Sequence, residues 1–305
     1  MLSKKIYWVL IITTFFLVSL VCAPTAQADP EAKVYLLAIG IDEYKYLPLM
    51  KSCANNAALV ASAFAAAVQN TEATLLLNEQ ATKENIQNKL QEYKRTLNDN
   101  DQLLIYYSGH GGKNTMYWNT QQTTTRYQWR EENVYDESIM PVYADYNKNT
   151  HLTTEELAEL LKEFPTKNMV MIIDSSYSEI DGNLTGFLPS FQNVSQTPRP
   201  RSSLRDFNMY GITIMNASDW KEVSYEKIFN GKIFGVFTYY LAQGITERIS
   251  QADTAGSFSL NKVFEYSRML TMQEVGIQHP QIYRGRNRDL VLFYTSVSKG
   301  QVVLE

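Results

Sequence analysis

The sequence predicts an α/β fold, a three-layer sandwich in which a mostly parallel six-stranded sheet carries helices on both faces. Short apolar segments rich in β-branched and aromatic residues alternate along the chain with longer segments of helical periodicity. The apolar segments are nearly continuous, as in residues 34–41, which is typical of strands buried on both faces of a parallel sheet. Strands that alternate with helices in this way favour right-handed βαβ units.

Strands are expected where the chain is briefly apolar between turn-forming residues, at 34–41, 72–77, 101–108, 168–173, 211–217 and 290–294. Helices are expected where apolar residues recur at helical spacing, at 54–68, 82–97, 153–164, 234–246 and 260–274. Ser52 or Asn55 is expected to cap the first helix, and Thr82 stands at the start of the second. Thr153 and Glu156 form a capping-box pattern at the third helix.

Two segments interrupt this regular pattern. Residues 112–134 are polar and aromatic and read as a long excursion from the end of a strand. Residues 181–206 read as a loop because glycine and proline recur in them. We expect one domain over residues 29–305, with a first part at 34–180 and a second at 207–294 on either side of that loop. The carboxyl-terminal third is expected to be only loosely joined.

The amino-terminal segment, residues 1–28, has the three parts of a secretory signal peptide. Lys4 and Lys5 precede an apolar run over residues 6–22, and Ala-Gln-Ala at 26–28 offers a cleavage site. We therefore expect a secreted or periplasmic protein. An uncleaved membrane anchor is the alternative, because the run approaches the length that spans a bilayer. The net charge is −4 for the whole chain and about −6 without the signal peptide, so nothing suggests nucleic-acid binding.

Chemistry-bearing residues follow two of the predicted strands at their carboxyl ends. Strand 101–108 leads into a Gly-His-Gly turn that contains His110, and strand 168–173 leads into a segment that contains Ser176. The carboxyl ends of parallel strands border the crevice where α/β sheets bind their ligands. His110 and Ser176 are therefore expected at one site, where a histidine base and a hydroxyl nucleophile would suit a hydrolase.

An ordered set of short motifs points to one family. These motifs lie at residues 36–44, 52–57, 107–111, 136–137, 174–178, 217–218, 222–226 and 235–241. The set resembles the caspase-like peptidases, nearest to the metacaspase and bacterial caspase-like branch, and it extends over roughly residues 34–294. This resemblance implies a caspase-like three-layer sandwich and the activity of a cysteine-type endopeptidase.

The resemblance assigns roles to individual residues. His110 is implied as the general base and acid, and the backbone amides of Gly111 and residue 176 as the oxyanion hole. Amides aimed at developing charge commonly contribute about 3 kcal/mol each. Asp174 is implied to line the pocket for a basic side chain, which it would bind through charge-assisted hydrogen bonds. Asn56 stands where metacaspases usually have a second acid, so this preference should be weakened.

Position 176, where the family has its cysteine, holds serine. A cysteine beside a histidine is partly ionised near neutral pH, whereas a serine hydroxyl must lose its proton as it attacks. That reaction normally requires an acid that orients the histidine, and no such residue is identifiable in the sequence. Ser176 is a natural loss of activity, a laboratory substitution or a working serine variant. Further departures from the family at Glu179 and Asn56 favour natural loss.

We therefore expect an exported caspase-like domain with lost or strongly reduced proteolytic activity, which binds peptides or partner proteins through the retained groove. Ser218 and Ser224 are expected in its substrate-binding region. The alternative is an active or silenced cysteine-type endopeptidase that cleaves after arginine or lysine. A purely structural domain is disfavoured by His110, Gly111 and Asp174. A membrane partner is expected only if the amino-terminal segment stays uncleaved, and the oligomeric state is left open.

No cofactor is expected. Residues 145–152 with Glu156 offer oxygen ligands at calcium-loop spacing, although Thr150 replaces the glycine of the sharp turn, so calcium remains an alternative. The three histidines are too scattered for a zinc cluster. Cys53 is expected to be a buried, inert thiol rather than a substitute nucleophile. The basic stretch Arg199-Pro200-Arg201 is either a self-cleavage site or a solvated linker.

Overall fold

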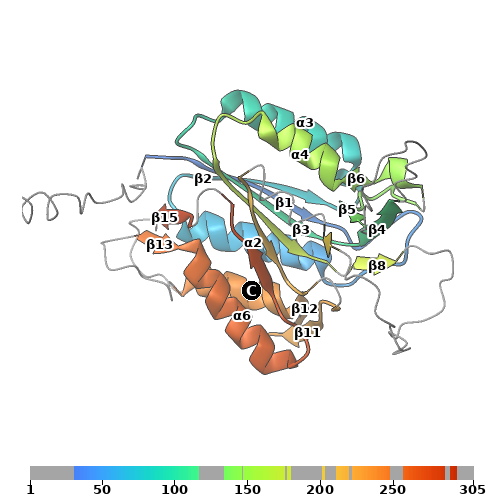
Figure 1. Cartoon of the computed structure of the whole chain (residues 1–305). Coiled ribbons are helices and arrows are strands. Elements are labelled where there is room, and N and C mark those ends of the chain that lie inside the picture. Colours follow the sequence, from blue (N-terminus) through green and yellow to red (C-terminus); the bar gives the residue numbers. More distant parts are fainter. Residues whose placement is uncertain are drawn as a thin grey trace, which may run out of the picture.

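A central six-stranded sheet organises the fold (Figure 1). The computed structural model describes residues 31–116, 134–145, 147–175, 177–179, 201–202, 211–219, 222–247, 257–285 and 289–293. The strand order is β14-β10-β7-β3-β1-β2, and all neighbours are parallel except β10 with β14. The strands are β1 (Val34–Gly40), β2 (Thr71–Leu77), β3 (Gln102–Ser108), β7 (Asn168–Asp174), β10 (Thr213–Asn216) and β14 (Gln281–Tyr283). The predicted α/β class with a mostly parallel sheet is confirmed.

Side chains of the central strands enter two different hydrophobic cores, one on each face of the sheet. In β1, Leu36 and Ala38 belong to one core, whereas Leu37 and Ile39 belong to the other. All four side chains are fully buried. Successive strand residues point to opposite faces, so a strand covered on both sides must be apolar throughout. This requirement explains the continuous apolar run in the sequence.

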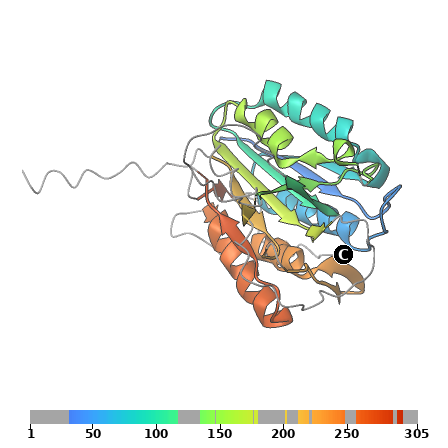
Figure 2. The ribbon, with the colours of Figure 1, turned by 45° about the vertical axis from the view of Figure 1, so that its right-hand side comes forward.

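Helices form a layer on each side of the sheet. α3 (Lys83–Thr96) and α4 (Thr154–Lys162) pack on one face, and α2 (Cys53–Ala67), α5 (Val236–Thr246) and α6 (Leu260–Val275) pack on the other. Figures 1 and 2 show the sheet between these two layers. The predicted three-layer sandwich is confirmed, and each expected helix ends within two residues of its predicted bounds.

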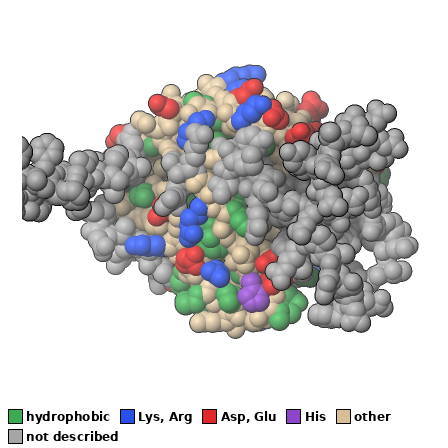
Figure 3. Space-filling view, in the orientation of Figure 1, with side chains coloured by type: hydrophobic (Ala, Val, Ile, Leu, Met, Phe, Trp, Pro, Cys, Tyr) green, Lys and Arg blue, Asp and Glu red, His purple; other side chains and the backbone are tan. Residues whose placement is uncertain are grey.

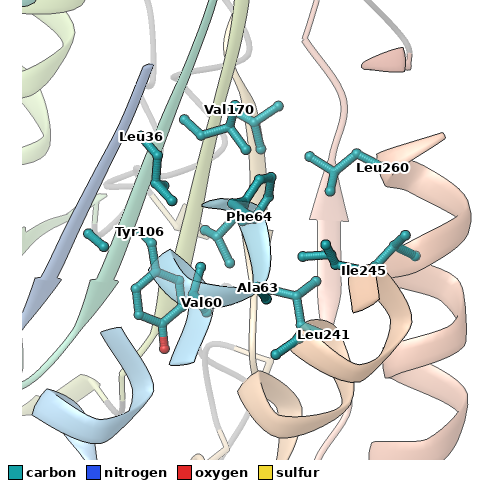
Figure 4. Close-up of a cluster of buried hydrophobic side chains, with 14 of the residues drawn as sticks. Leu36, Val60, Ala63, Phe64, Tyr106, Val170, Leu241, Ile245 and Leu260 are labelled. Atoms are coloured by element: carbon teal, nitrogen blue, oxygen red, sulfur yellow. The ribbon is translucent and has the colours of Figure 1, made fainter. Parts of the chain in front are cut away.

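The carboxyl-terminal helices share a core with α2 and the sheet. Leu241 and Ile245 of α5 and Leu260 of α6 are fully buried in the cluster that also holds Val60 and Phe64 of α2 (Figure 4). Full burial of a leucine or phenylalanine side chain contributes about 1.5–3 kcal/mol. The expectation that the carboxyl-terminal third is loosely joined is therefore wrong for the described residues.

A smaller sheet adjoins the carboxyl ends of β3 and β7. It contains β4 (Gly111–Met116), β5 (Val134–Ile139), β6 (Leu152–Thr153) and β8 (Tyr177–Glu179), in the order β6-β5-β4-β8. The excursion expected at 112–134 therefore begins and ends in strands, while residues 117–133 lie outside the described residues. β9 (Arg201–Ser202) pairs with β5, so Arg201 belongs to a short strand rather than to the predicted loop. Arg199 lies outside the described residues.

The sixth strand of the central sheet is not the one that the sequence predicts. The apolar segment at 290–294 forms β15 (Val291–Phe293), which pairs with β13 (Ser257–Ser259) in a separate two-stranded sheet. The central sheet is instead completed by β14, which runs antiparallel to β10 with Ile214 opposite Tyr283. A strand of three residues is too short to show the period-two alternation on which the prediction relied.

A β-hairpin that was not predicted from the sequence precedes α5. Strands β11 (Glu226–Phe229) and β12 (Lys232–Gly235) pair antiparallel. Between them Asn230 and Gly231 have φ values of 51° and 82°. These left-handed conformations suit a two-residue hairpin turn, and an Asn-Gly pair is a strong sequence signal for it. The hairpin matters for the site because Gly235 lies beside the Asp174 carboxylate.

The amino terminus of α2 is capped by a distant residue. The backbone amides of Cys53 and Ala54 donate to the Asp42 carboxylate at 2.8 and 3.0 Å. Ser52 makes no side-chain cap bond, and the Asn55 side chain donates instead to a carbonyl of the hairpin. The predicted cap is therefore wrong, because a carboxylate on the preceding loop takes the free amides.

The other two predicted helix caps are confirmed. Thr82 accepts a hydrogen bond from the Asn85 amide at the start of α3. Thr153 and Glu156 form a complete capping box at the start of α4. Both signals are local in the sequence, which is why they could be predicted without knowledge of the fold.

Acidic and basic side chains are interspersed on the face of the molecule shown in Figure 3. Within the described ranges, no helix is both long and apolar enough to cross a bilayer. In the same ranges, no group of three or more His, Cys, Asp or Glu side chains is placed to hold a metal ion. The predicted signal peptide, residues 1–28, lies outside the described residues.

Candidate active site

His110 directly follows β3 at the carboxyl edge of the sheet. Its Nε2 lies 2.8 Å from the backbone carbonyl oxygen of Pro48. A carbonyl oxygen only accepts hydrogen bonds, so Nε2 carries the proton and Nδ1 keeps the lone pair that a general base needs. Burial lowers the pKa of His110, and the bond to Pro48 opposes this shift. The imidazole is therefore neutral, and able to accept a proton, at pH 7.

A backbone carbonyl is thus the group that orients His110, and the sequence could not reveal it because every residue has one. The Pro48 carbonyl fixes the imidazole ring and its tautomer, as the acid does in a serine peptidase. It carries no full negative charge to stabilise the imidazolium formed on proton transfer. This arrangement suits a sulfur nucleophile, which ionises readily, better than it suits a hydroxyl.

Gly111 is the first residue of β4 and pairs with Tyr177, the first residue of β8. The preceding strands, β3 and β7, are parallel neighbours along their whole length. The segments that follow these two strands therefore meet at one edge of the sheet. Ser176 lies outside the described residues, so its role as the nucleophile position and its oxyanion hole with Gly111 stay predictions.

Asp174 is the last residue of β7 and is 5% exposed. The Ser224 hydroxyl donates to Oδ1, and the Thr238 hydroxyl donates to Oδ2 at 2.6 Å. The backbone amide of Thr238, in the first turn of α5, also donates to this carboxylate, where the helix dipole favours negative charge. Burial raises the pKa of Asp174, and the bonds from the two hydroxyls oppose the rise.

Asn56 of α2 lies in the same buried cluster. Its Oδ1 accepts from the Gly235 amide at 2.8 Å, and its Nδ2 donates to the hydroxyls of Ser108 and Ser52 at 3.1 and 3.2 Å. A Cβ at Gly235 would lie 2.2 Å from Asp174 Oδ2 and 3.0 Å from Asn56 Nδ2, so only glycine fits there. Asn56 is therefore a neighbour of Asp174 but supplies an uncharged amide.

Glu226 provides a second carboxylate near Asp174. No separate role was predicted for this residue from the sequence. Its Oε1 accepts from the Ser52 hydroxyl at 2.6 Å, and Ser52 accepts in turn from Asn56. The negative charge of Glu226 contributes to the raised pKa of Asp174. The available signal was its position as the last residue of the motif at 222–226.

Residues 36–184 match the family model of the metacaspase, peptidase C14 domain. The matched range contains His110, Asp174 and position 176, in the order that the motifs predicted. This part of the chain is therefore similar to the caspase-like peptidases. The six-stranded, mostly parallel sheet with a helix layer on each face agrees with this assignment. Proteins of a peptidase family act on peptides or proteins, so this class of ligand is supported for the caspase-like chain.

Two solved structures resemble this caspase-like chain. A crystal structure of a Geobacter sulfurreducens protein matches with a TM-score of 0.53 and 14% identity, covering 83% of this chain and 93% of that one. Caspase-1 from Spodoptera frugiperda matches with a TM-score of 0.49 and 11% identity, covering 85% of this chain and 89% of that one. At such identities a likeness concerns the fold alone. A search among curated proteins found no match.

The two serines predicted for the substrate-binding region of this caspase-like chain have different surroundings. Ser224 contacts Asp174 directly and also lies 3.3 Å from Gln278 Nε2. Ser218 is 5% exposed, and its hydroxyl donates to the Glu222 carbonyl at 3.4 Å. The structure therefore brings Ser224, but not Ser218, into direct contact with the predicted pocket acid. Substrate binding by either serine stays a prediction.

Cys53 is a free thiol in the first turn of α2 and is 2% exposed. Burial raises its pKa well above the ordinary value, a hydrogen bond with Ser108 opposes the rise, and the nearby acids Asp42, Asp174 and Glu226 add to it. A buried, protonated thiol is a poor nucleophile. The prediction of a buried thiol is confirmed, and its chemistry argues against a substitute for position 176.

The candidate calcium loop is held together by the protein's own groups. Lys83 Nζ lies 2.7 and 2.9 Å from the two carboxylate oxygens of Glu156. Asp145 Oδ1 accepts from the Asn147 amide at 2.7 Å and from the Thr150 hydroxyl at 2.9 Å. An ammonium group thus occupies the carboxylate that a calcium ion would need. The Lys83 pair therefore disfavours calcium at this loop, and calcium binding stays an untested alternative.

Proposed function

We propose that this chain is an exported caspase-like domain that binds peptides through a basic side chain and has lost most or all of its proteolytic activity. The observation that carries the proposal is the orientation of His110 by the Pro48 carbonyl rather than by an acid. Export rests on the signal-peptide pattern of residues 1–28.

The loss of activity follows from the chemistry of serine in this setting. A serine hydroxyl must be deprotonated by the imidazole as it attacks, and the imidazolium then needs an acid beside it. In a serine peptidase, replacing that acid by its amide lowers kcat by about 10⁴-fold. With the Pro48 carbonyl in the orienting place, none of the described residues gives the imidazolium that support. In a site shaped for sulfur, the smaller oxygen of a serine would also stand short of the substrate carbonyl, and about 1 Å of misplacement costs roughly a hundredfold.

Peptide binding rests on the acids of the pocket. Asp174 and Glu226 accept hydrogen bonds from serine and threonine hydroxyls. Among the described residues, no lysine, arginine or histidine forms an ion pair with either acid. A guanidinium or ammonium group from a peptide would supply the missing positive charge through charge-assisted bonds. Glu226 provides the second negative charge that Asn56 no longer offers.

A second candidate function is endopeptidase activity after arginine or lysine, in an active or silenced cysteine-type enzyme. The neutral His110 with an unprotonated Nδ1 favours it, because a general base is present and oriented. In this case the Ser176→Cys variant would restore the enzyme, since a cysteine needs only the histidine.

Cleavage assays with arginine-terminated reporter peptides separate the two functions. We expect no turnover by the protein with Ser176 or by the matched Ser176→Ala variant, and a gain with Ser176→Cys that disappears when His110→Ala is added. Turnover by the natural protein that vanishes in both Ser176→Ala and His110→Ala would overturn the loss of activity.

Peptide binding is tested on the natural protein with fluorescent peptides that end in arginine or in citrulline, its uncharged isostere. Fluorescence anisotropy should show at least tenfold tighter binding of the arginine peptide, because a hydrogen bond to a charged group contributes about 1.5–3 kcal/mol. Equal affinities, or no binding of either peptide, would refute the proposed charge recognition.

A further inference from the structure

Two buried tyrosines hold the backbone of His110. The His110 amide donates to the Tyr44 hydroxyl oxygen at 2.8 Å. The hydroxyl oxygens of Tyr44 and Tyr107 are 3.1 Å apart, and Tyr107 donates to the His110 carbonyl at 2.5 Å. Because Tyr107 donates to the carbonyl, the proton between the two tyrosines belongs to Tyr44. The hydrogen bonds therefore form a closed ring that begins and ends at the two backbone polar groups of His110.

The ring is buried and closely packed. Tyr44 is 5% exposed and Tyr107 is fully buried. A Cβ at Gly109 would lie 2.3 Å from the Tyr44 hydroxyl and 2.7 Å from that of Tyr107. Gly109 does not have positive φ, so glycine is needed there for close approach rather than for a turn. Removing one hydroxyl would leave buried polar partners unsatisfied, which is costly.

The loop between β1 and α2, which contains Tyr44, also holds the imidazole ring of His110. The Tyr44 ring lies against that of His110, with centroids 4.8 Å apart. Pro48, four residues after Tyr44, accepts the hydrogen bond from Nε2. The loop is anchored by the bond from the Lys45 amide to the Val142 carbonyl at 3.1 Å. One loop segment therefore contacts both the backbone and the side chain of His110.

We propose that Tyr44 and Tyr107 are positioning residues that keep the imidazole of His110 in its Nε2-protonated form against the Pro48 carbonyl. The inference rests on the proposed role of His110 as the general base. The hydroxyl ring fixes the backbone from which the imidazole projects, and this fixed backbone keeps Nε2 within hydrogen-bonding distance of Pro48. The tyrosines thus do by backbone placement part of what an orienting acid does by direct contact in a serine peptidase.

Nuclear magnetic resonance of isotope-labelled histidine tests this directly, since the chain has three histidines. In the natural protein, His110 should show a single Nε2-protonated tautomer and a lowered pKa. In Tyr44→Phe and Tyr107→Phe, both tautomers should be populated, and the pKa of His110 should rise toward its ordinary value of 6.5 as water enters. The tautomer reports position and is not changed by a loss of global stability alone.

Tyr93→Phe is the matched control. Tyr93 is fully buried in the same core, and its hydroxyl bonds to Thr74 at 2.7 Å, with no bond to the His110 turn. This variant should lower the melting temperature and leave the His110 signals unchanged. If Tyr44→Phe and Tyr107→Phe behave like Tyr93→Phe, with an unaltered tautomer and pKa, the positioning role is refuted.

An activity arm separates this inference from the proposed function. In the Ser176→Cys background, Tyr44→Phe should lower kcat at least tenfold with little change in KM, because misplacement of about 1 Å costs roughly a hundredfold. An unchanged kcat would overturn the inference. If Ser176→Cys has no activity, the proposed role of His110 as a general base loses its support, while the magnetic resonance result still decides whether the tyrosines position its ring.

Discussion

Two clusters of carboxylates in this molecule differ in what compensates their charge. Beside the loop at 145–151, Glu156 in the first turn of α4 is paired with the Lys83 ammonium at 2.7 Å. In the cluster at the end of β7, Asp174 and Glu226 receive hydrogen bonds from hydroxyl groups, and no ion pair reaches them from the described residues.

The difference separates a cluster whose charge is paired within the fold from the one that we propose binds a basic side chain. The Lys83 ammonium places a positive charge beside Glu156 within the fold. Burying Asp174 without a cation lowers stability, as its raised pKa shows. A negative charge that is desolvated but uncompensated binds an incoming cation more strongly than a charge already paired.

The largest effect is expected for Asp174→Asn, which removes the charge and keeps the size. Binding of an arginine peptide to the Ser176 protein should weaken by about tenfold to a hundredfold, because a hydrogen bond to a charged group contributes about 1.5–3 kcal/mol. Calorimetric titration measures the change, and Asp145→Asn in the other cluster is the control. Equal losses in both variants would erase the distinction between the clusters.

The pH dependence of the same variant sharpens the comparison. The folded-state pKa of Asp174 is raised above 3.8, so its ionisation destabilises the fold, and the natural protein loses stability as pH rises from 3.8 through the folded value. Asp174→Asn should therefore be the more stable protein above this window, and the gap should close below it. Denaturation in urea at several pH values measures the gap, and a gap that widens toward acid would contradict the assignment.

Arginine-peptide binding should follow the opposite course with pH. Asp174 must be ionised to bind a guanidinium group, so affinity should fall as pH drops through the raised pKa. Anisotropy titrations of the arginine and citrulline peptides at several pH values measure this, with the citrulline peptide as the control. An arginine affinity that stays constant across the window would show that Asp174 is not the partner.

A smaller effect is expected for Lys83→Met, which removes the ammonium from the other cluster. Side chains of Lys83 and Glu156 are 25% and 42% exposed, so screening limits the loss to about 1 kcal/mol, or roughly 2–4 °C in melting temperature for a domain of this size. Peptide affinity should not change. Glu156→Gln with the double variant completes a cycle, and additive effects would show that the pair contributes nothing.

The smallest effect is expected from calcium. Because Lys83 already holds Glu156, adding millimolar calcium or a chelator should leave the melting temperature of the natural protein unchanged. Thermal unfolding monitored by circular dichroism measures this, with magnesium as the control cation. A calcium-specific rise in melting temperature would show that a metal displaces the ammonium and that the cluster is not self-contained.

Structural features that depend only on residues close together in the sequence could be predicted from the sequence. The apolar run of β1, the helices and the caps at Thr82 and Thr153 are local patterns, and the motifs located His110 and Asp174 correctly at one edge of the sheet. Chain order along parallel strands was sufficient for that placement, because their carboxyl ends must share an edge.

The groups that orient His110 and shift the pKa of Asp174 could be identified only from the tertiary structure. The Pro48 carbonyl orients His110, and backbone carbonyls have no sequence signature. Glu226 approaches Asp174 from a hairpin about 50 residues further along the chain, and Lys83 reaches Glu156 from another helix. The same is true of β14, whose three residues become a strand only because β10 offers a free edge. Local periodicity determines the elements, whereas contacts between them determine the charge balance and hydrogen-bond partners on which chemistry depends.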